Sequence, residues 1–327
     1  MAVKTMIEAI RDGLREEMER DERVFVMGED VGPRGGVFGV TDGFFKQFGP
    51  TRVIDAPLAE SVIAGAAIGA AINGMRPVAE MQFSDFSHPA MDQLMNEAAK
   101  IRYRSNGAFN VPMVVRMPYG GGIHGALYHS QSVEALYAHI PGLTVVIPSN
   151  PYDAKGLLKA AIRDPDPVIF LEHKGAYRLI RGEVPDEDYT VPLGKATVVR
   201  EGRDMTAIAY GMMLHHCLKA AEEMASAGVE VEVVDVRTIS PLDREMIIAS
   251  VKKTGKALVV YEDNRSGGWG AEISASIAEA AIEYLDGPIL RVTGPDVPAM
   301  PYNHAQEEFF MPNPEKILHA MKELAAY

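Results

Sequence analysis

Short hydrophobic runs rich in β-branched residues alternate along the chain with segments of helical periodicity. Residues 4–20 carry apolar side chains at helical spacing: Met6, Ile7, Ile10, Leu14 and Met18. Up to residue 173 the runs that predict strands are RVFVMG, TRVID, RPVAEMQF, VPMVVRMP, GLTVVIPS and PVIFLEH. Among the segments between them, PAMDQLMNEAAKIRYRS predicts one helix over residues 89–105. Strand runs separated by helices are typical of a parallel sheet that is covered on both faces.

The alternation breaks once and then resumes. Residues 175–203 are rich in charge, proline and glycine, which is typical of a linker. Beyond them the runs DMTAIAYG, VEVEVVDVR, KALVVYED and PILRVTG predict further strands. We therefore predict an α/β protein with two parallel-sheet domains, the first over residues 1–185 and the second over residues 204–327, joined by a linker over 186–203.

Composition narrows the function classes. The formal charge of −13 argues against nucleic acid as a partner, because such proteins need clustered Lys and Arg. One cysteine, Cys217, excludes an intrachain disulfide and suits a reducing compartment. The N-terminal segment mixes acidic and basic residues, unlike a signal or transit peptide, and no apolar helical run reaches the ~20 residues that span a bilayer. We expect a cytoplasmic protein without a membrane partner.

Several kinds of chemistry have no support in the sequence. The loop GEDVGPRGG lacks the Gly-Lys-Ser/Thr of a P-loop and does not match GxGxxG. HExxH, CxxC and GxSxG are also missing. His124 and His129 lie five residues apart, which is poor spacing for two metal ligands on one helical face. Hydride transfer, serine hydrolysis and zinc chemistry are therefore not predicted.

A carboxylate stands at the start of a helix made of small residues. Glu60 begins the run ESVIAGAAIGAAI, in which Gly65 and Gly69 lie four residues apart among alanines. Small side chains let another backbone or a flat ligand approach closely. From these residues alone, the run can be a core helix whose N-terminus Glu60 complements, a contact face for a second subunit, or part of a ligand site.

A series of motifs along the whole chain resembles one family. The motifs are GEDVG, DAPLAES, RPVAEMQFSDF, NEAAKIRYRS, GGGIHGALYHSQS, PGLTVVIPSNPYDAKGLLKAAIRDPDPVIFLEHK, VVDVRTISPLD and GPDVPAMPY. In this order they resemble the β subunit of the thiamine-diphosphate-dependent 2-oxo acid dehydrogenases. The resemblance implies a pyrimidine-binding domain followed by a transketolase C-terminal-like domain. It also implies decarboxylation of a 2-oxo acid and reductive acylation of a lipoyl group.

The resemblance assigns Glu60 to the cofactor. In the family, the Glu of the PL-x-E motif binds the aminopyrimidine ring and promotes the imino tautomer that deprotonates the thiazolium carbon. This role requires a carboxyl in a dry, apolar pocket, where desolvation favours the protonated form. We expect the small-residue helix to provide that setting. By the same match, Phe86, Leu58 and Gln82 contact the cofactor, and Glu29 joins a polar relay between active sites.

The resemblance also singles out the histidines of the glycine-rich loop. His129, in HSQS, corresponds to the residue that acts near the substrate carbonyl and the incoming lipoyl group. Its ordinary pKa of about 6.5 suits proton transfer in either direction near neutrality. His124 is expected to be a neighbour in the substrate pocket. A purely structural role for either loop histidine is the alternative.

A monovalent cation site is implied near the segment AAIRDPDPVIF. In relatives the corresponding turn binds K⁺ through backbone oxygens, and hard cations prefer oxygen ligands. The matching positions here are Met113, Ala161, Ile162, Asp164 and Asp166. Two Asp-Pro pairs are also ordinary turn chemistry, so the segment alone does not distinguish the two interpretations.

The motif GDG, at which thiamine enzymes bind Mg²⁺ and the diphosphate, is missing from the chain. The family implies an α subunit that supplies this half of the site in an α₂β₂ heterotetramer, and a lipoyl acyltransferase core as a further partner. The motifs look most like branched-chain members, with pyruvate and acetoin members as alternatives. A self-sufficient transketolase-type enzyme and a non-catalytic scaffold subunit are the rival hypotheses.

Overall fold

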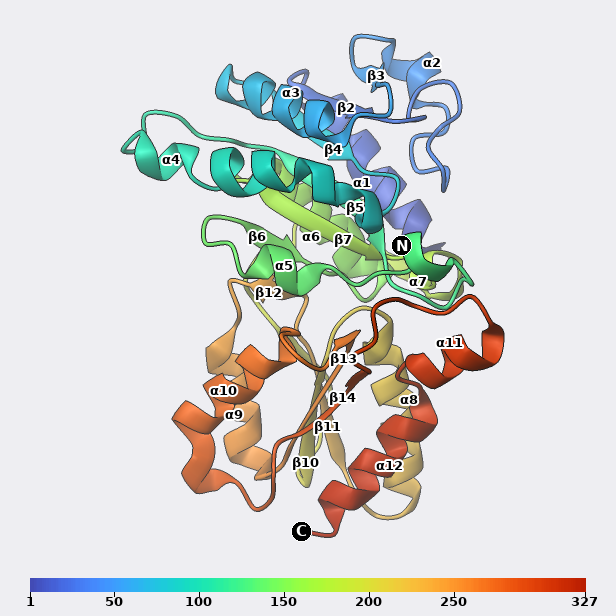
Figure 1. The fold of residues 1–327 in the computed structure, drawn as a ribbon, viewed down its shortest axis with the longest axis vertical. Helices are drawn as coiled ribbons and strands as arrows, with labels where there is room; N and C mark the ends of the chain where they lie inside the picture. The colour runs from blue at the N-terminus through green and yellow to red at the C-terminus, as the bar shows by residue number, and fades with distance from the viewer. The chain divides into compact units, whose positions relative to one another are not determined.

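The computed structural model describes residues 1–327, which divide into two compact units. The first comprises residues 1–119 and 136–193, and the second comprises residues 120–135 and 194–327. Each has a mainly parallel sheet with helices on both faces, so the predicted α/β class is confirmed (Figure 1). None of the helices has the length and the apolar character needed to cross a membrane.

The sheet of the first unit runs in the order β6-β7-β5-β4-β2-β3, with every neighbouring pair parallel. Its strands are β2 (Val24–Gly28), β3 (Val53–Asp55), β4 (Arg76–Glu80), β5 (Val114–Tyr119), β6 (Thr144–Val146) and β7 (Val168–His173). The central strands β5 and β7 are buried along their whole length. This burial explains why they are continuous hydrophobic runs rather than alternating ones.

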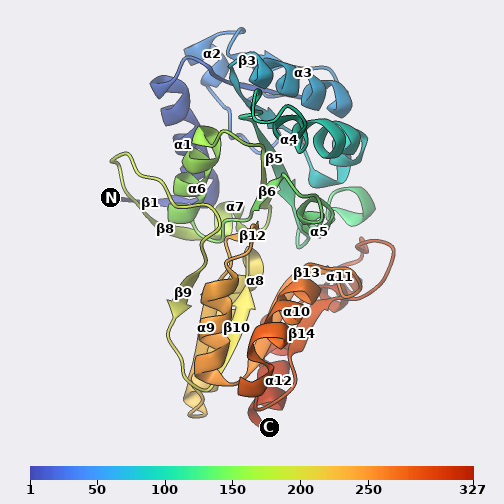
Figure 2. The same ribbon diagram turned by 90° about the vertical axis from the view of Figure 1, so that its left-hand side faces the viewer.

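Helices cover both faces of this sheet. Figure 2 shows α1 (Met6–Arg20) and α6 (Pro151–Arg163) on one side, with α3 (Glu60–Ile72) on the other. The predicted start of the first helix at residue 4 is wrong, because Thr5 is its N-cap and forms a capping box with Glu8. The residues before it form β1 (Ala2–Thr5), which pairs antiparallel with β8 (Arg181–Val184).

The segment from Pro89 to Ser105, predicted as one helix, is broken into pieces. The chain forms the 3₁₀ helix η1 (Ser84–Ala90), then the π-helix η2 (Gln93–Ala98), and then the short helix α4 (Ile101–Arg104). Pro89 lies inside η1, where it cannot donate a backbone hydrogen bond. The wide turn of η2 is closed by the Ala99 N–H, which donates to the Leu94 carbonyl at 3.0 Å.

The sheet of the second unit runs in the order β14-β13-β10-β11-β9. Its strands are β9 (Thr197–Arg200), β10 (Met205–Ala209), β11 (Val231–Asp235), β13 (Ala257–Asn264) and β14 (Leu290–Gly294). Figure 1 shows α9 (Arg244–Thr254) and α10 (Gly270–Ala281) on one face and α8 (Met212–Ser226) and α12 (Pro314–Ala325) on the other. Strand β9 lies within the predicted linker and pairs antiparallel with β11, so part of that segment belongs to the sheet.

The remaining elements are short. They are α2 (Phe44–Phe48), η3 (Ala126–Tyr128), α5 (Glu134–Ala138), α7 (Ala176–Leu179), β12 (Thr238–Ser240), η4 (Ile282–Tyr284) and α11 (His304–Phe310). Of these, η3, β12, η4 and α11 belong to the second unit, where η3 lies within the glycine-rich loop described below and α11 contacts that loop.

A buried ion network crosses the centre of the first sheet. Arg116 on β5 is 1% exposed and lies between Glu80 on β4 and Glu172 on β7. Its Nη1 is 2.6 Å from Glu80, while Nε and Nη2 bind both oxygens of Glu172 at 2.6 and 2.7 Å. The Tyr177 hydroxyl donates to Glu172 at 2.5 Å. Burial raises the pKa of Glu80, and the charge of Arg116 opposes that rise.

Replacing Arg116 with Met should lower the free energy of unfolding by about 3–5 kcal/mol, because it leaves two buried carboxylates without a countercharge. The loss should shrink as the pH falls, since a carboxyl whose folded-state pKa is raised favours the folded state at low pH. Urea unfolding followed by circular dichroism measures both effects. Arg104→Met is the control, because Arg104 forms only a surface pair with Glu97 at 2.9 Å. Equal midpoints for the two variants would contradict the prediction.

Candidate functional site

Neighbouring strands bring the predicted cofactor residues to one edge of the first sheet. Glu29 follows β2, Leu58 and Glu60 follow β3, and Gln82 and Phe86 follow β4. Strands β3, β2 and β4 are adjacent and parallel, so the segments after them emerge at the same edge. The carboxyl edge of an open parallel sheet is where α/β proteins bind ligands.

Two hydrogen bonds connect these segments. The Ser61 hydroxyl, in the first turn of α3, donates to the Pro89 carbonyl of η1 at 2.6 Å. The Gln82 side-chain amide donates to the Asp30 carboxylate at 3.2 Å. The first bond holds the N-terminus of α3 against the segment that carries Phe86, and the second holds the segment after β4 against that after β2.

An aromatic chain leads from the ion network to Phe86. The Phe38 ring packs on Tyr177 with centroids 5.1 Å apart and on Phe83 with centroids 5.5 Å apart. Phe83 in turn packs edge-on against Phe86 at 5.6 Å. Phe86 itself is half-buried, so one part of its ring remains open to a ligand. Edge-on contacts of this kind fix ring orientation as well as position.

The carboxylates at this edge lie close together but are not sequestered. The pKa of Glu29 is raised, first by burial and then by the negative charges of Asp30 and Glu60. Glu60 is only half-buried, and its carboxylate makes no hydrogen bond or ion pair within the chain. Leu58, two residues before it, is 72% exposed. The small-residue helix and its apolar lead-in therefore do not by themselves enclose Glu60, because Leu58 faces outward.

The histidines lie in the second unit, on the loop of residues 120–135. The Gly120 N–H donates to the Gln131 carbonyl at 3.1 Å and closes the loop. His129 is half-buried and directly follows η3, whereas His124 is exposed and has its Nδ1 2.5 Å from the Glu307 carboxylate. His124 is thus engaged by its own chain.

The positions matched to a K⁺ site lie around the C-terminal end of α6. The carbonyl oxygens of Ile162 and Asp164 accept hydrogen bonds from Nη1 of Arg76 at 2.6 and 3.1 Å. The Ala161 carbonyl accepts the Asp164 N–H, the Met113 carbonyl accepts the Val168 N–H, and Asp166 pairs with Arg102. Two of the matched oxygens therefore converge on a positive charge that the chain itself supplies.

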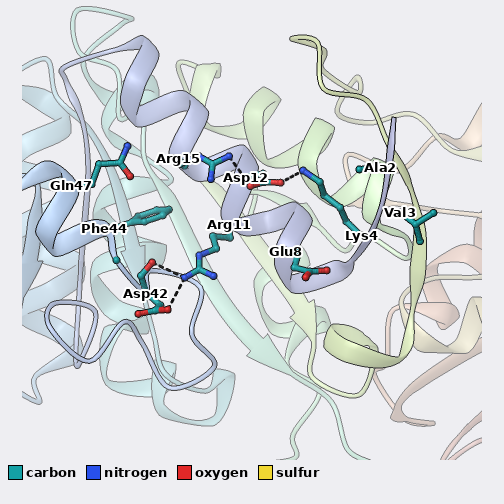
Figure 3. A pocket seen from close by; sticks show the side chains of 11 residues that line it. Ala2, Val3, Lys4, Glu8, Arg11, Asp12, Arg15, Asp42, Phe44 and Gln47 are labelled. Atoms are coloured by element: carbon teal, nitrogen blue, oxygen red, sulfur yellow. Dashed lines mark hydrogen bonds and ion pairs between the residues drawn. The ribbon is translucent and has the colours of Figure 1, made fainter.

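A groove of about 510 Å³ lies elsewhere, between β1, α1 and the loop before α2 (Figure 3). Its cationic side chains are paired within the chain, since Arg11 contacts Asp42 at 3.0 Å and Arg15 contacts Asp12 at 2.8 Å. Lys4 also pairs with Asp12. None of the predicted site residues lines this groove, so we assign no ligand to it.

Sequence comparisons identify the family of the chain. The transketolase pyrimidine-binding domain family matches residues 3–180, and the transketolase C-terminal domain family matches residues 194–317. The 2-oxoisovalerate dehydrogenase subunit beta of Bacillus subtilis is 59% identical over 100% of both chains. The chain belongs to the family of 2-oxo acid dehydrogenase β subunits.

Other relatives extend the comparison. The pyruvate dehydrogenase E1 component subunit beta of Bacillus subtilis is 51% identical over 100% of both chains, and that of Acholeplasma laidlawii is 49% identical over 99% of both. A solved chain described as a split gene transketolase, inactive beta4 tetramer, matches with a TM-score of 0.78 over 98% of both chains. At 24% identity, that likeness concerns the fold alone.

Three charged residues that contact the predicted site segments were not predicted from the sequence. Arg76 reaches the turn after α6, and Glu262 and Glu307 reach the glycine-rich loop. Glu307 is separated by 185 residues from Gly122, the loop residue whose N–H it accepts. No local pattern in the sequence indicates contacts over such distances, so only the folded chain reveals them.

Proposed function

We propose that this chain is the β subunit of an enzyme that decarboxylates a branched-chain 2-oxo acid on thiamine diphosphate and reductively acylates a lipoyl group. The observation that carries the proposal is the 59% identity to a 2-oxoisovalerate dehydrogenase β subunit over the full length of both chains. The enzyme is thus an oxidoreductase that acts on 2-oxo acids with a disulfide acceptor. We place it in the cytoplasm, on the sequence grounds given above.

Pyruvate is the alternative substrate, because pyruvate dehydrogenase β subunits match over the same length at 51% identity. Acetoin dehydrogenase remains a second alternative on the motifs alone. The difference in identity favours the branched-chain acid. Part of the substrate pocket would come from the α subunit, so this chain alone does not determine the size of the acyl group accepted.

The residues at the sheet edge fit the aminopyrimidine half of the cofactor. Glu60 offers a carboxyl with no partner in the chain, and Phe86 offers an aromatic ring whose orientation is fixed. Leu58 and Gln82 would add an apolar contact and an amide. When bound, thiamine diphosphate supplies the electron sink for decarboxylation. Glu60 would hydrogen-bond the pyrimidine ring through its carboxyl, and Glu29 would join a polar relay between active sites.

We assign the diphosphate and Mg²⁺ mainly to an α subunit in an α₂β₂ heterotetramer. The outward face of α3 supports a partner, because Val62 is 61% exposed and Ala66, Gly69 and Asn73 follow it at helical spacing. A Cβ at Gly69 would meet nothing within 4 Å in this chain. Glycine in a helix costs about 1 kcal/mol relative to alanine. A close approach by another subunit would account for it and would dry the surroundings of Glu60.

His129 is the proposed proton donor or acceptor for the substrate carbonyl and the incoming lipoyl group. A half-buried imidazole can donate or accept a proton near neutrality. The C-terminal domain is proposed to dock the lipoyl acyltransferase core. A scaffold without catalysis would require neither Glu60 nor His129, and a self-sufficient enzyme would require the missing GDG motif.

A structural K⁺ at Met113, Ala161, Ile162, Asp164 and Asp166 remains a proposal. Each carbonyl oxygen has two lone pairs, so Ile162 and Asp164 can bind both K⁺ and Arg76. Exchanging KCl for tetramethylammonium chloride should then lower the melting temperature, because a cation at about ten times its dissociation constant stabilises by about 1.4 kcal/mol. The drop should be larger in Arg76→Gln, which removes the competing charge. An unchanged melting temperature in both the wild type and Arg76→Gln would contradict a K⁺ site at this turn.

Calorimetric titration of thiamine diphosphate with Mg²⁺ tests the split site. We expect no heat of binding with this chain alone and saturable binding once the α subunit is added, because this chain carries only the pyrimidine half. Glu60→Ala should weaken or abolish the response in the mixture, while Glu308→Ala serves as a control with 67% of its side chain exposed. Tight binding to the chain alone would refute the heterotetramer.

Two variants should separate the roles of the proposed catalytic residues. In the assembled enzyme, Glu60→Ala should slow decarboxylation by roughly 10²–10⁴, the usual contribution of a general acid–base group. His129→Ala should retain cofactor binding but lose lipoyl acylation. Rates are measured with 3-methyl-2-oxobutanoate and with pyruvate, and the wild type should prefer the former. A fully active Glu60→Ala enzyme with bound cofactor would exclude the assigned role.

A further inference from the structure

The glycine-rich loop of the second unit has a conformation that must be held in place. His124 has φ of 56° and Ala126 has φ of 55°, in the left-handed region that residues with a Cβ seldom adopt. Two such residues within three positions cost free energy and persist only where the surroundings fix them. Within the loop, the Gly120 N–H donates to the Gln131 carbonyl at 3.1 Å and the Gln131 side-chain amide donates to the Leu127 carbonyl at 3.0 Å, and neither bond involves His124 or Ala126.

A buried carboxylate on α11 supplies the missing contacts. Glu307 is 3% exposed, and its Oε1 accepts the backbone N–H groups of Gly122 at 3.0 Å and of His124 at 3.2 Å. Its Oε2 lies 2.5 Å from Nδ1 of His124. One carboxylate thus binds the strained residue through both its backbone and its ring.

A second carboxylate holds the base of the same loop. Glu262 on β13 is 3% exposed, and its Oε1 accepts the Gly121 N–H at 2.5 Å and the Ser132 hydroxyl at 3.3 Å. The loop backbone is also pressed against the segment before α11. A Cβ on Gly121 would lie 2.6 Å from the Met300 side chain. Glu262 therefore joins the two ends of the loop, whereas Glu307 holds its strained middle.

The strained middle of the loop touches the residue assigned to proton transfer. A Cβ on Gly125 would lie 2.7 Å from the His129 carbonyl and 2.8 Å from the His129 Cβ. The backbone that follows His124 therefore packs directly on the backbone of His129. A backbone shift at His124 would therefore change the packing of His129.

We propose that Glu307 is a positioning residue that fixes His129 for reaction by clamping Gly122 and His124. The proposal rests on the proposed function for the chemistry of His129, but the clamp itself concerns only this chain. A carboxylate suits the task because it can accept several N–H groups at once. An amide at this position would still accept both backbone N–H groups through its oxygen, and could donate to a neutral His124.

The test uses the assembled enzyme with its α subunit and an isolated lipoyl domain as acceptor. Glu307→Ala should lower the rate of lipoyl acylation by about 10²-fold, the scale of a small misplacement of a reacting group. Binding of thiamine diphosphate should stay within about twofold, since the residues proposed to bind it lie in the first unit. Glu307→Gln should restore most of the rate, and Glu307→Asp, which keeps the charge but shortens the reach, should not.

Hydrogen exchange gives a readout that does not depend on activity. In Glu307→Ala and Glu307→Asp, the amides of residues 120–126 should exchange at least about tenfold faster than in the wild type, with the rest of the second unit unchanged. The exposed neighbour variant Glu308→Ala should match the wild type in both measurements.

The outcomes separate the two proposals. A wild-type enzyme without lipoyl acylation would overturn the proposed function, while amide exchange would still test the clamp. An active wild type with normal acylation and normal exchange in Glu307→Ala would overturn the clamp. A Glu307→Gln enzyme as impaired as Glu307→Ala would also overturn it, because a hydrogen-bond acceptor would then be insufficient.

Discussion

The buried guanidinium of Arg116 fixes the part of the first sheet from which the residues proposed to bind the cofactor emerge. It bridges carboxylates from the two strands beside its own, so the three strands have one satisfactory register. The side chains are almost inaccessible, and an unpaired charge there would be strongly destabilising. Glu80 ends β4, directly before the segment that carries Gln82 and Phe86. The ion network therefore sets where that segment leaves the sheet.

The same network fixes the aromatic side chains of the edge. Tyr177 donates to Glu172, and its ring begins the chain that passes through Phe38 and Phe83 to Phe86. The ion network in the sheet thus fixes the orientation of the Phe86 ring at the surface through this series of packed rings. A ring fixed from behind loses little freedom when a flat ligand covers its open face, which favours binding of the ligand.

Sequence reasoning predicted the features that depend on local pattern. Helical spacing at Met6, Ile10 and Leu14 and continuous apolar strands were sufficient for the two α/β units. It failed where tertiary contacts override that pattern, as in the broken helix after Pro89 and in β9. The motif around Glu60 led to the proposed role of this residue but did not predict its surroundings, because the exposure of Leu58 depends on how the chain leaves β3.

The two carboxylates Glu60 and Glu307 have opposite environments, and this contrast bears on their roles. Glu307 is buried and is bound by N–H groups of its own chain, so it is committed to holding structure. Glu60 is half-buried and has no partner in the chain, although it lies at a helix N-terminus among small residues. The subunit itself therefore supplies only part of the environment of the Glu60 carboxylate, which has no partner and is flanked by exposed apolar side chains. The proposed cofactor and α subunit would complete that environment, and this is the physical reason to expect the catalytic centre at a subunit interface.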